Sequence, residues 1–214
     1  MKRLAWIGIA LGLTCAASAQ VRMFVTMGGK RIGQAVASQK LLPDGAKLVQ
    51  LSMQITGPNG ETVNLRSSSQ YDPKGQPTRM FHESITGKAK VRRAVTVTFS
   101  KSGANVVEDV SGTRKTKQVP LVASAPWASA SEFWFIRDTP KPGQADKRYR
   151  FNISSLDWEL TTTTYVGRKM IDLNGKKVTA HELKSNQGTA HVDGGGMPIR
   201  IDLGQIKLEK APDA

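Results

Sequence analysis

The chain has 214 residues, and its 31 Lys and Arg against 17 Asp and Glu give a formal net charge of +14. Hydrophobic residues make up 39% of the sequence, which also contains 20 Gly, 10 Pro and a single Cys. This composition excludes a disulfide scaffold, a collagen repeat and a disordered chain. The length suits one domain with a substantial core, so the sequence predicts a globular fold with an unusually basic surface.

The N-terminus has the pattern of a secretory signal peptide. Lys2 and Arg3 precede an apolar run over residues 4–13, and the small residues Ala17-Ser18-Ala19 follow it. We therefore expect residues 1–19 to be removed and residues 20–214 to form a single β-rich domain in the periplasm or outside the cell. The apolar run is too short to cross a bilayer, and no later segment approaches the length that a transmembrane helix needs, so we expect a soluble product.

Cys15 raises a second possibility, because bacterial lipoproteins are cleaved just before a cysteine that then carries the lipid. Leu13 stands one place too close to this cysteine, and Thr14 occupies a position that favours Gly, Ala or Ser. We therefore prefer cleavage after Ala19. That cleavage leaves no cysteine in the mature chain, which excludes both a disulfide and thiolate catalysis.

Short stretches that alternate apolar and polar residues predict β-strands from Val21 onward. The alternation is clear over residues 47–55, 91–99 and 149–153, and glycine-containing turns separate such stretches. Tight turns join antiparallel neighbours, and no helical segment separates the strands. We therefore expect a mainly β protein of about ten strands, a single antiparallel curved sheet in the form of a half-barrel or open sandwich.

One segment departs from the β pattern and predicts a short helix near residues 129–138. Ser129 and Glu132 have the spacing of a capping box, and Pro140 ends the segment. Eight aromatic residues lie between residues 127 and 165, which suggests that this helix packs on the sheet. The aromatic side chains then form either a core plug, which we prefer, or a lid over a ligand pocket.

A turn pattern occurs twice in the chain. Residues 72–80 and 193–201 both read D-x-x-G-x-P-x-R followed by an apolar residue. Asp and Gly favour the turn, and Pro is tolerated at the start of the following strand. Because the spacing to neighbouring motifs differs between the copies, we interpret the pattern as a shared hairpin turn and not as a tandem repeat.

Catalytic motifs are absent from the sequence. It contains no phosphate-binding loop and no nucleophile elbow, and Ser185 replaces the second histidine that a zinc-protease motif beginning at His181 requires. A metal site built from His82, His181 and His191 is possible on adjacent strands, but no regular ligand spacing supports it. We expect no catalytic residue, no metal and no cofactor.

The basic residues gather in four clusters, at residues 88–93, 114–117, 147–150 and 168–177. Such clusters attract polyanions without specifying which one, although a solvated surface is an equally good interpretation. For an exported protein the polyanions within reach are lipid head groups, lipopolysaccharide, wall polymers and extracellular DNA. The signal peptide argues against a specific nucleic-acid partner inside the cell.

Four segments carry a family resemblance: residues 27–33, 71–77, 131–137 with Gly143, and 165–170. In this order they resemble a family of exported bacterial β-rich proteins of unknown function. The resemblance implies a single β domain and supplies no catalytic residues. At the level of the fold, these proteins are similar to the lipoprotein-localisation carriers, in which a half-barrel beneath a helical lid encloses acyl chains.

Two functional hypotheses follow, with a hydrolase as a third and weaker one. The first is a non-enzymatic envelope protein that binds a lipid-like or amphipathic anionic ligand beside the aromatic segment; its candidate ligand-binding residues are Trp127, Phe133, Trp134, Phe135, Trp158, Arg148 and Arg150. The alternative is a structural or interaction module of the envelope that binds an anionic polymer or a partner protein through a basic face.

Overall fold

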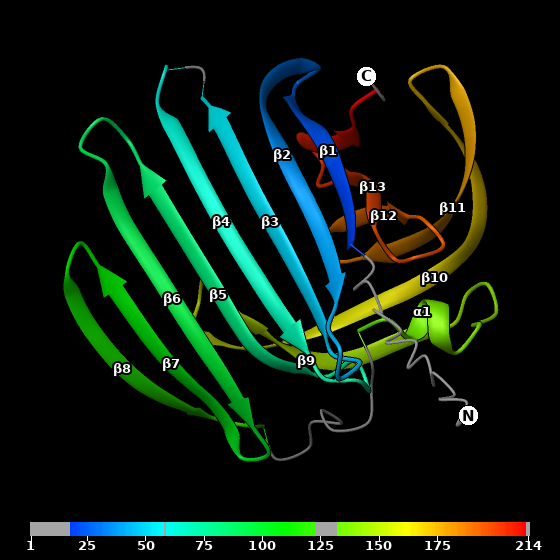
Figure 1. Cartoon of the computed structure of the whole chain (residues 1–214). Coiled ribbons are helices and arrows are strands. Elements are labelled where there is room, and N and C mark those ends of the chain that lie inside the picture. Colours follow the sequence, from blue (N-terminus) through cyan, green and yellow to red (C-terminus); the bar gives the residue numbers. More distant parts are fainter. Residues whose placement is uncertain (1–17, 58, 123–131, 213–214) are drawn as a thin grey trace, which may run out of the picture.

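The computed structural model describes residues 18–57, 59–122 and 132–212. Over these residues the chain forms one fourteen-stranded antiparallel sheet and a helix of a single turn (Figure 1). The first eight strands are β1 (Ser18–Met27), β2 (Lys30–Leu41), β3 (Lys47–Thr56), β4 (Thr62–Tyr71), β5 (Pro77–Thr86), β6 (Val91–Ser100), β7 (Gly103–Val110) and β8 (Thr113–Pro120). Helix α1 (Trp134–Arg137) and six further strands follow: β9 (Ala145–Asn152), β10 (Asp157–Leu173), β11 (Lys176–Ser185), β12 (Gly188–Val192), β13 (Pro198–Asp202) and β14 (Ile206–Lys210).

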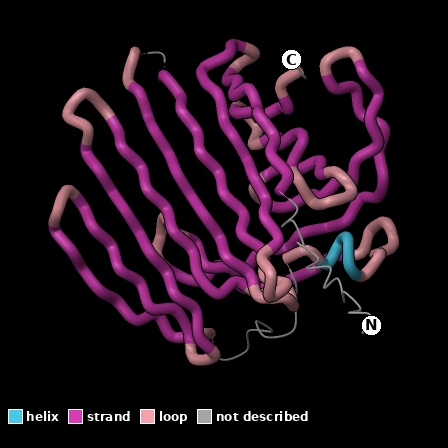
Figure 2. Tube along the Cα trace, viewed as in Figure 1, coloured by secondary structure: helices cyan, strands magenta, loops and turns pink. Residues whose placement is uncertain are grey.

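The sheet consists of two meanders joined at one seam. Strands β1–β8 pair in sequence order, as do β9–β14, and β1 pairs with β14 to connect the two runs. Strands β8 and β9 are therefore the two edges of the sheet. Figure 2 shows the long strands of the first meander as a curved wall, with the second meander turning behind it.

The two ends of the sheet overlap instead of closing by hydrogen bonds. One apolar cluster contains Val95, Val97 and Val106 from the wall together with Phe151 and Trp158 from the β9–β10 hairpin. A strand has two faces, so the hairpin can turn one face to this wall and the other to the space enclosed by the sheet. The overlap explains why the sheet is coiled yet remains open.

A second apolar cluster lies beneath the seam between the two meanders. Val21, Met23 and Val25 alternate along β1 with more exposed residues, and they pack with Ala35 of β2 and Leu208 of β14. The period-two alternation that predicts strands therefore also identifies the buried face of β1. No helix within the described residues is long and apolar enough to span a bilayer.

The predicted fold class is confirmed, with two differences in detail. The described residues form fourteen strands and not about ten, because the edge strand β8 is polar almost throughout and β12–β14 are only five residues long. The predicted helix near residues 129–138 is, among the described residues from 132 onward, a single turn over residues 134–137, and its N-cap Phe133 forms no side-chain capping bond. The predicted cap Ser129 lies outside the described residues.

The repeated turn pattern is confirmed as a shared hairpin turn. In the first copy Asp72 donates its N–H to the Gln76 carbonyl, and the Asp72 carboxylate accepts from the Gln76 N–H at 2.8 Å. Asp193 and Met197 make the same pair of contacts in the second copy. The aspartate of each copy is therefore explained by the turn itself.

Candidate functional site

Two cavities lie between β5 and the β9–β10 hairpin. The larger, here called the interior cavity, has a volume of about 490 Å³, and the smaller aromatic cavity has about 100 Å³. Met80, Arg150 and Phe151 line both, so the two adjoin. Both are lined by Arg150, one of the predicted ligand-binding residues.

The register of the β9–β10 hairpin explains the polar character of the interior cavity. Arg150 pairs with Glu159, Arg148 with Thr161 and Asp146 with Thr163, so these side chains share one face of the hairpin. The opposite face carries the aromatic side chains that pack on the wall. The hairpin is thus amphipathic, with an apolar face that packs on the wall and a polar face that lines much of the interior cavity. Phe151 and Ile153 of the apolar face also line this cavity.

The aromatic cavity is mostly apolar. Tyr71, Met80, Phe99 and Phe151 line it, and the rings of Phe99 and Phe151 meet edge to face with their centres 5.9 Å apart. Glu132 and Arg150 supply its charged groups. The two cavities together therefore offer a polar compartment, an apolar compartment and an arginine at their junction.

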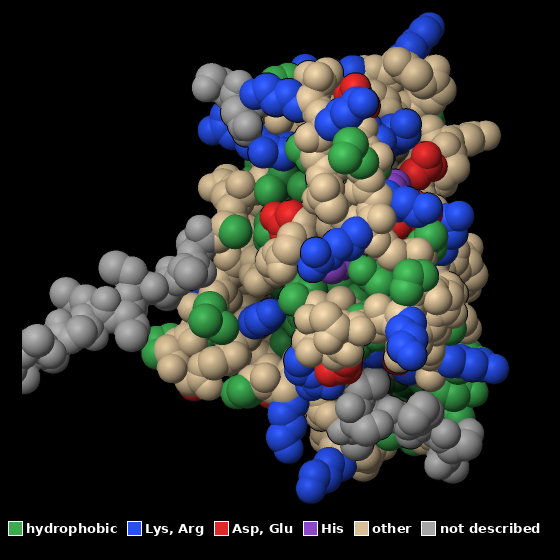
Figure 3. Space-filling model, turned by 90° about the vertical axis from the view of Figure 1, so that its right-hand side faces the viewer, with side chains coloured by type: hydrophobic (Ala, Val, Ile, Leu, Met, Phe, Trp, Pro, Cys, Tyr) green, Lys and Arg blue, Asp and Glu red, His purple; other side chains and the backbone are tan. Residues whose placement is uncertain are grey.

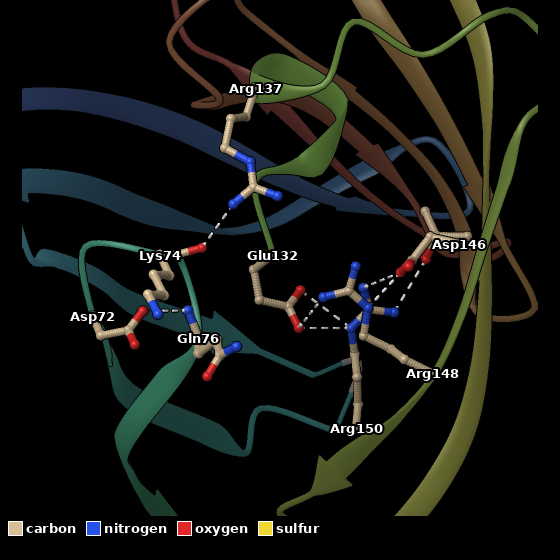
Figure 4. A network of polar contacts seen from close by, with 9 residues as sticks. Asp72, Lys74, Gln76, Glu132, Arg137, Asp146, Arg148 and Arg150 are labelled. Atoms are coloured by element: carbon tan, nitrogen blue, oxygen red, sulfur yellow. Dashed lines mark hydrogen bonds and ion pairs between the residues drawn. The ribbon is translucent and has the colours of Figure 1, made fainter. Parts of the chain in front are cut away.

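Arg148 and Arg150 belong to an ion-pair network (Figure 4). Arg150 Nε donates to both carboxylate oxygens of Glu132, at 3.1 and 3.2 Å, and its NH1 donates to Thr163 at 3.1 Å. Arg148, whose side chain is only 4% exposed, pairs with Asp146 and lies 3.8 Å from Glu132. Two guanidinium groups thus face two carboxylates, as the burial of such charges requires.

Glu132 is held in this network from the side of α1. Its backbone N–H donates to the Gly75 carbonyl at 3.0 Å, and Arg137 donates to the Lys74 carbonyl at 3.2 Å. The Phe133 ring meets Tyr71 edge to face with the centres 5.2 Å apart. The turn at residues 72–76 therefore positions the α1 segment, and two of the four segments that carry the family resemblance meet here.

Burial controls the titration of Tyr71 at this site. Burial raises the pKa of the Tyr71 phenol, and the neighbouring Glu132 carboxylate raises it further. The phenol therefore stays protonated at physiological pH and presents a neutral hydroxyl to the aromatic cavity.

The structure separates those predicted ligand-binding residues that it describes into four places. Arg150 lines both cavities, and Arg148 lies beside it in the network. Trp134 and Phe135 are buried against Tyr165 and Leu183, and Trp158 packs on the wall; Phe133 contacts Tyr71, while Trp127 lies outside the described residues. The position of Trp134 and Phe135 agrees with the preferred interpretation of the aromatic segment as core.

Several cavity residues were missed by sequence reasoning. Thr161 and Thr163 lie in an uninterrupted run of threonines that carries no obvious signal, and Met80 was one apolar residue among many. The sequence pattern assigns Glu132 to a helix capping box, whereas in the structure its carboxylate pairs with Arg150. Its pairing with Arg150 could not be read from the sequence because eighteen positions separate them.

The three histidines do not converge. His181 pairs with Val192 across β11 and β12, whereas His191 pairs with Glu182, so the two imidazoles lie on opposite faces of the sheet. His181 Nδ1 lies 3.0 Å from the Tyr165 hydroxyl, and His82 lies on the distant strand β5. No group of three metal-binding side chains occurs within the residues that the structure describes.

Among solved structures, the chain is similar to the beta-barrel-like protein of domain of unknown function DUF1849 from Brucella abortus, with a TM-score of 0.58 and 10% identity. The similarity covers 90% of this chain and 94% of that chain, and at this identity it shows the fold alone. A DUF1089 family protein from Pseudomonas aeruginosa matches 96% of this chain and 99% of its own, at 13% identity and a TM-score of 0.41. No family model and no curated protein matches the sequence.

Proposed function

We propose that the protein is a non-enzymatic, exported envelope protein that binds an amphipathic anionic ligand in its two adjoining cavities. The observation that carries the proposal is the position of Arg150 at the junction of a polar and an apolar compartment. In this arrangement the ligand's anionic head group contacts Arg150 and Thr163. Its apolar part contacts Met80, Phe99 and Phe151.

The size and lining of the cavities support a small ligand. The interior cavity, at about 490 Å³, falls within the usual range of small-molecule sites. Thr161 and Thr163 supply hydroxyl groups that can both donate and accept hydrogen bonds. The larger compartment is the polar one, so the proposed ligand has a substantial head group and a short apolar part.

The Arg150 guanidinium is already paired with the Glu132 carboxylate, so an incoming anion must compete with that carboxylate. The network holds two positive and two negative groups. Removing the Glu132 charge leaves one guanidinium without its counter-ion and favours an external anion. The site is therefore selective for ligands that offer a carboxylate or phosphate in place of Glu132.

The proposal is tested with a fluorescent carboxylic acid that has a short apolar chain and a polar head group, and with its neutral methyl ester. Arg150→Gln should weaken binding of the acid by about tenfold or more, the range expected for a charged hydrogen bond, and should leave the ester unaffected. Glu132→Gln should strengthen binding of the acid. Arg79→Gln, which removes an exposed arginine from β5, serves as the control and should behave like the unaltered protein.

Two outcomes count against the proposal. If neither probe binds the delipidated protein, the cavities are not a site for amphipathic ligands. If both probes bind and neither responds to Arg150→Gln, a ligand binds elsewhere and Arg150 does not recognise its head group.

A further inference from the structure

The hairpin turns at one end of the first meander are strongly basic. Successive antiparallel hairpins place the β1–β2, β3–β4, β5–β6 and β7–β8 turns at the same end of the wall (Figure 1). Exposed cations lie in or directly after three of these turns, and together they are here called the basic rim: Lys30, Arg31, Lys88, Lys90, Arg114 and Lys115. The described residues of the four turns contribute one carboxylate, Glu61, and Asp109 and Glu108 lie opposite Arg114 and Lys115 across the β7–β8 hairpin.

The opposite end of the same meander has fewer exposed cations. Its three turns carry the carboxylates Asp44 and Asp72 and the exposed ammonium groups Lys74 and Lys101. The exposed Arg79 lies near the start of the following strand, as Lys115 does in the rim. By the same criterion, this end therefore has three exposed cations where the rim has six.

Exposed apolar side chains accompany the cations of the basic rim. Val91 at the start of β6 is 47% exposed, and Val110 at the end of β7 is 40% exposed. Leu203, in the turn between β13 and β14, is 49% exposed, and the pairing of Met27 with Ile206 brings this turn to the same end of the sheet. Figure 3 faces the β10–β11 side of the molecule, away from the β5–β8 turns, and shows that Lys and Arg side chains with apolar ones among them also lie at the upper end of that side.

We propose that the basic rim docks the protein onto an anionic lipid bilayer. A row of cations spread over several turns fits an extended anionic surface better than a single small anion, because each turn reaches a different head group. Exposed Val and Leu beside Lys and Arg are the combination that binds in the interfacial layer of a membrane. None of the rim residues lines the interior cavity or the aromatic cavity, so docking is separable from the proposed ligand binding.

The test is sedimentation with sucrose-loaded vesicles, either of phosphatidylcholine alone or with about 30% phosphatidylglycerol. The full chain should sediment with the anionic vesicles only, and less so at high salt. The combined substitutions Lys30→Gln, Lys88→Gln and Arg114→Gln should weaken this binding by about tenfold or more. The control, Lys40→Gln, Lys101→Gln and Lys141→Gln, makes the same change in charge away from the rim and should bind like the unaltered protein.

A Leu203→Trp variant reports on contact with the membrane. Its added fluorescence should shift to shorter wavelength with anionic vesicles and be quenched by brominated lipid, because the side chain enters the interface. The proposal is overturned if the rim and control variants bind equally, or if soluble polyglutamate abolishes binding while Leu203→Trp shows no quenching. The second result would identify the rim as a site for an anionic polymer. The binding assay with the fluorescent acid and its ester is unaffected by either result.

Discussion

Gly33 has no room for a side chain. A Cβ atom at this position would lie 2.0 Å from the backbone carbonyl oxygen of Gln54 on the neighbouring strand β3. Backbone atoms of a paired strand cannot move away without breaking the ladder. Gly60, by contrast, has φ +78 and nothing within 4 Å of an added Cβ, so only its backbone conformation favours glycine.

We expect Gly33→Ala to lower the free energy of unfolding by about 3 kcal/mol and Gly60→Ala by about 1 kcal/mol. Urea unfolding followed by tryptophan fluorescence measures both. Equal costs for the two variants would mean that β2 and β3 separate easily at this point, contrary to the close pairing seen here.

The β9–β10 hairpin is the element that decides whether the cavities exist. Strand β9 is an edge strand and forms no hydrogen-bonded ladder with β8. The hairpin is therefore held against the wall by apolar packing and by a few polar contacts. Arg93 makes the clearest of these: it pairs with Glu108 at 2.7 Å and donates to the Ile153 carbonyl at 3.3 Å. The arginine thereby ties the hairpin turn to the wall.

Arg93→Met should loosen this turn while leaving the wall intact. We expect hydrogen exchange at residues 152–157 to quicken by about tenfold or more, as loss of a charged hydrogen bond implies. Arg92→Met is the matched control, because Arg92 pairs with Glu83 on the wall and does not contact the hairpin. Equal exchange in the two variants would show that apolar packing alone holds the hairpin.

At the scale of the whole molecule, all three histidines favour their neutral form. Burial lowers the pKa of His82, His181 and His191 below the ordinary value of 6.5; Arg93 and Arg168 lower the pKa of His82 and His181 further, whereas Glu182 opposes the shift at His191. The unfolded chain therefore binds protons that the folded chain does not as pH falls below 6.5. The contribution of the histidines to the free energy of unfolding is therefore complete above pH 6.5 and decreases as the pH falls below it.

We expect the free energy of unfolding to be lower at about pH 5.5 than at about pH 7.5, and His82→Gln to reduce the difference. Urea unfolding at the two pH values provides the measurement. A protein that becomes more stable on acidification to pH 5.5 would contradict the direction of these shifts.

The fold class could be predicted from the sequence, because alternation along a strand such as β3 and glycine turns between strands are local signals. The sequence also located the two hairpin turns built on Asp72 and Asp193, whose side-chain bonds span only four residues. Strand number was underestimated where, as in β8, an edge strand has almost no buried face and so no alternation to read.

Which side chains meet depends on the tertiary structure. Arg148, Arg150 and Trp158 lie within eleven residues of one another, yet the two arginines share one face of the hairpin and Trp158 lies on the other, because successive residues of a strand point to opposite sides. The overlap of the two sheet ends then places the hairpin beside the wall, and it depends on contacts between residues far apart in the chain. Local sequence patterns do not reveal such long-range contacts. The sequence therefore predicted a β protein, whereas the candidate site could be located only in the structure.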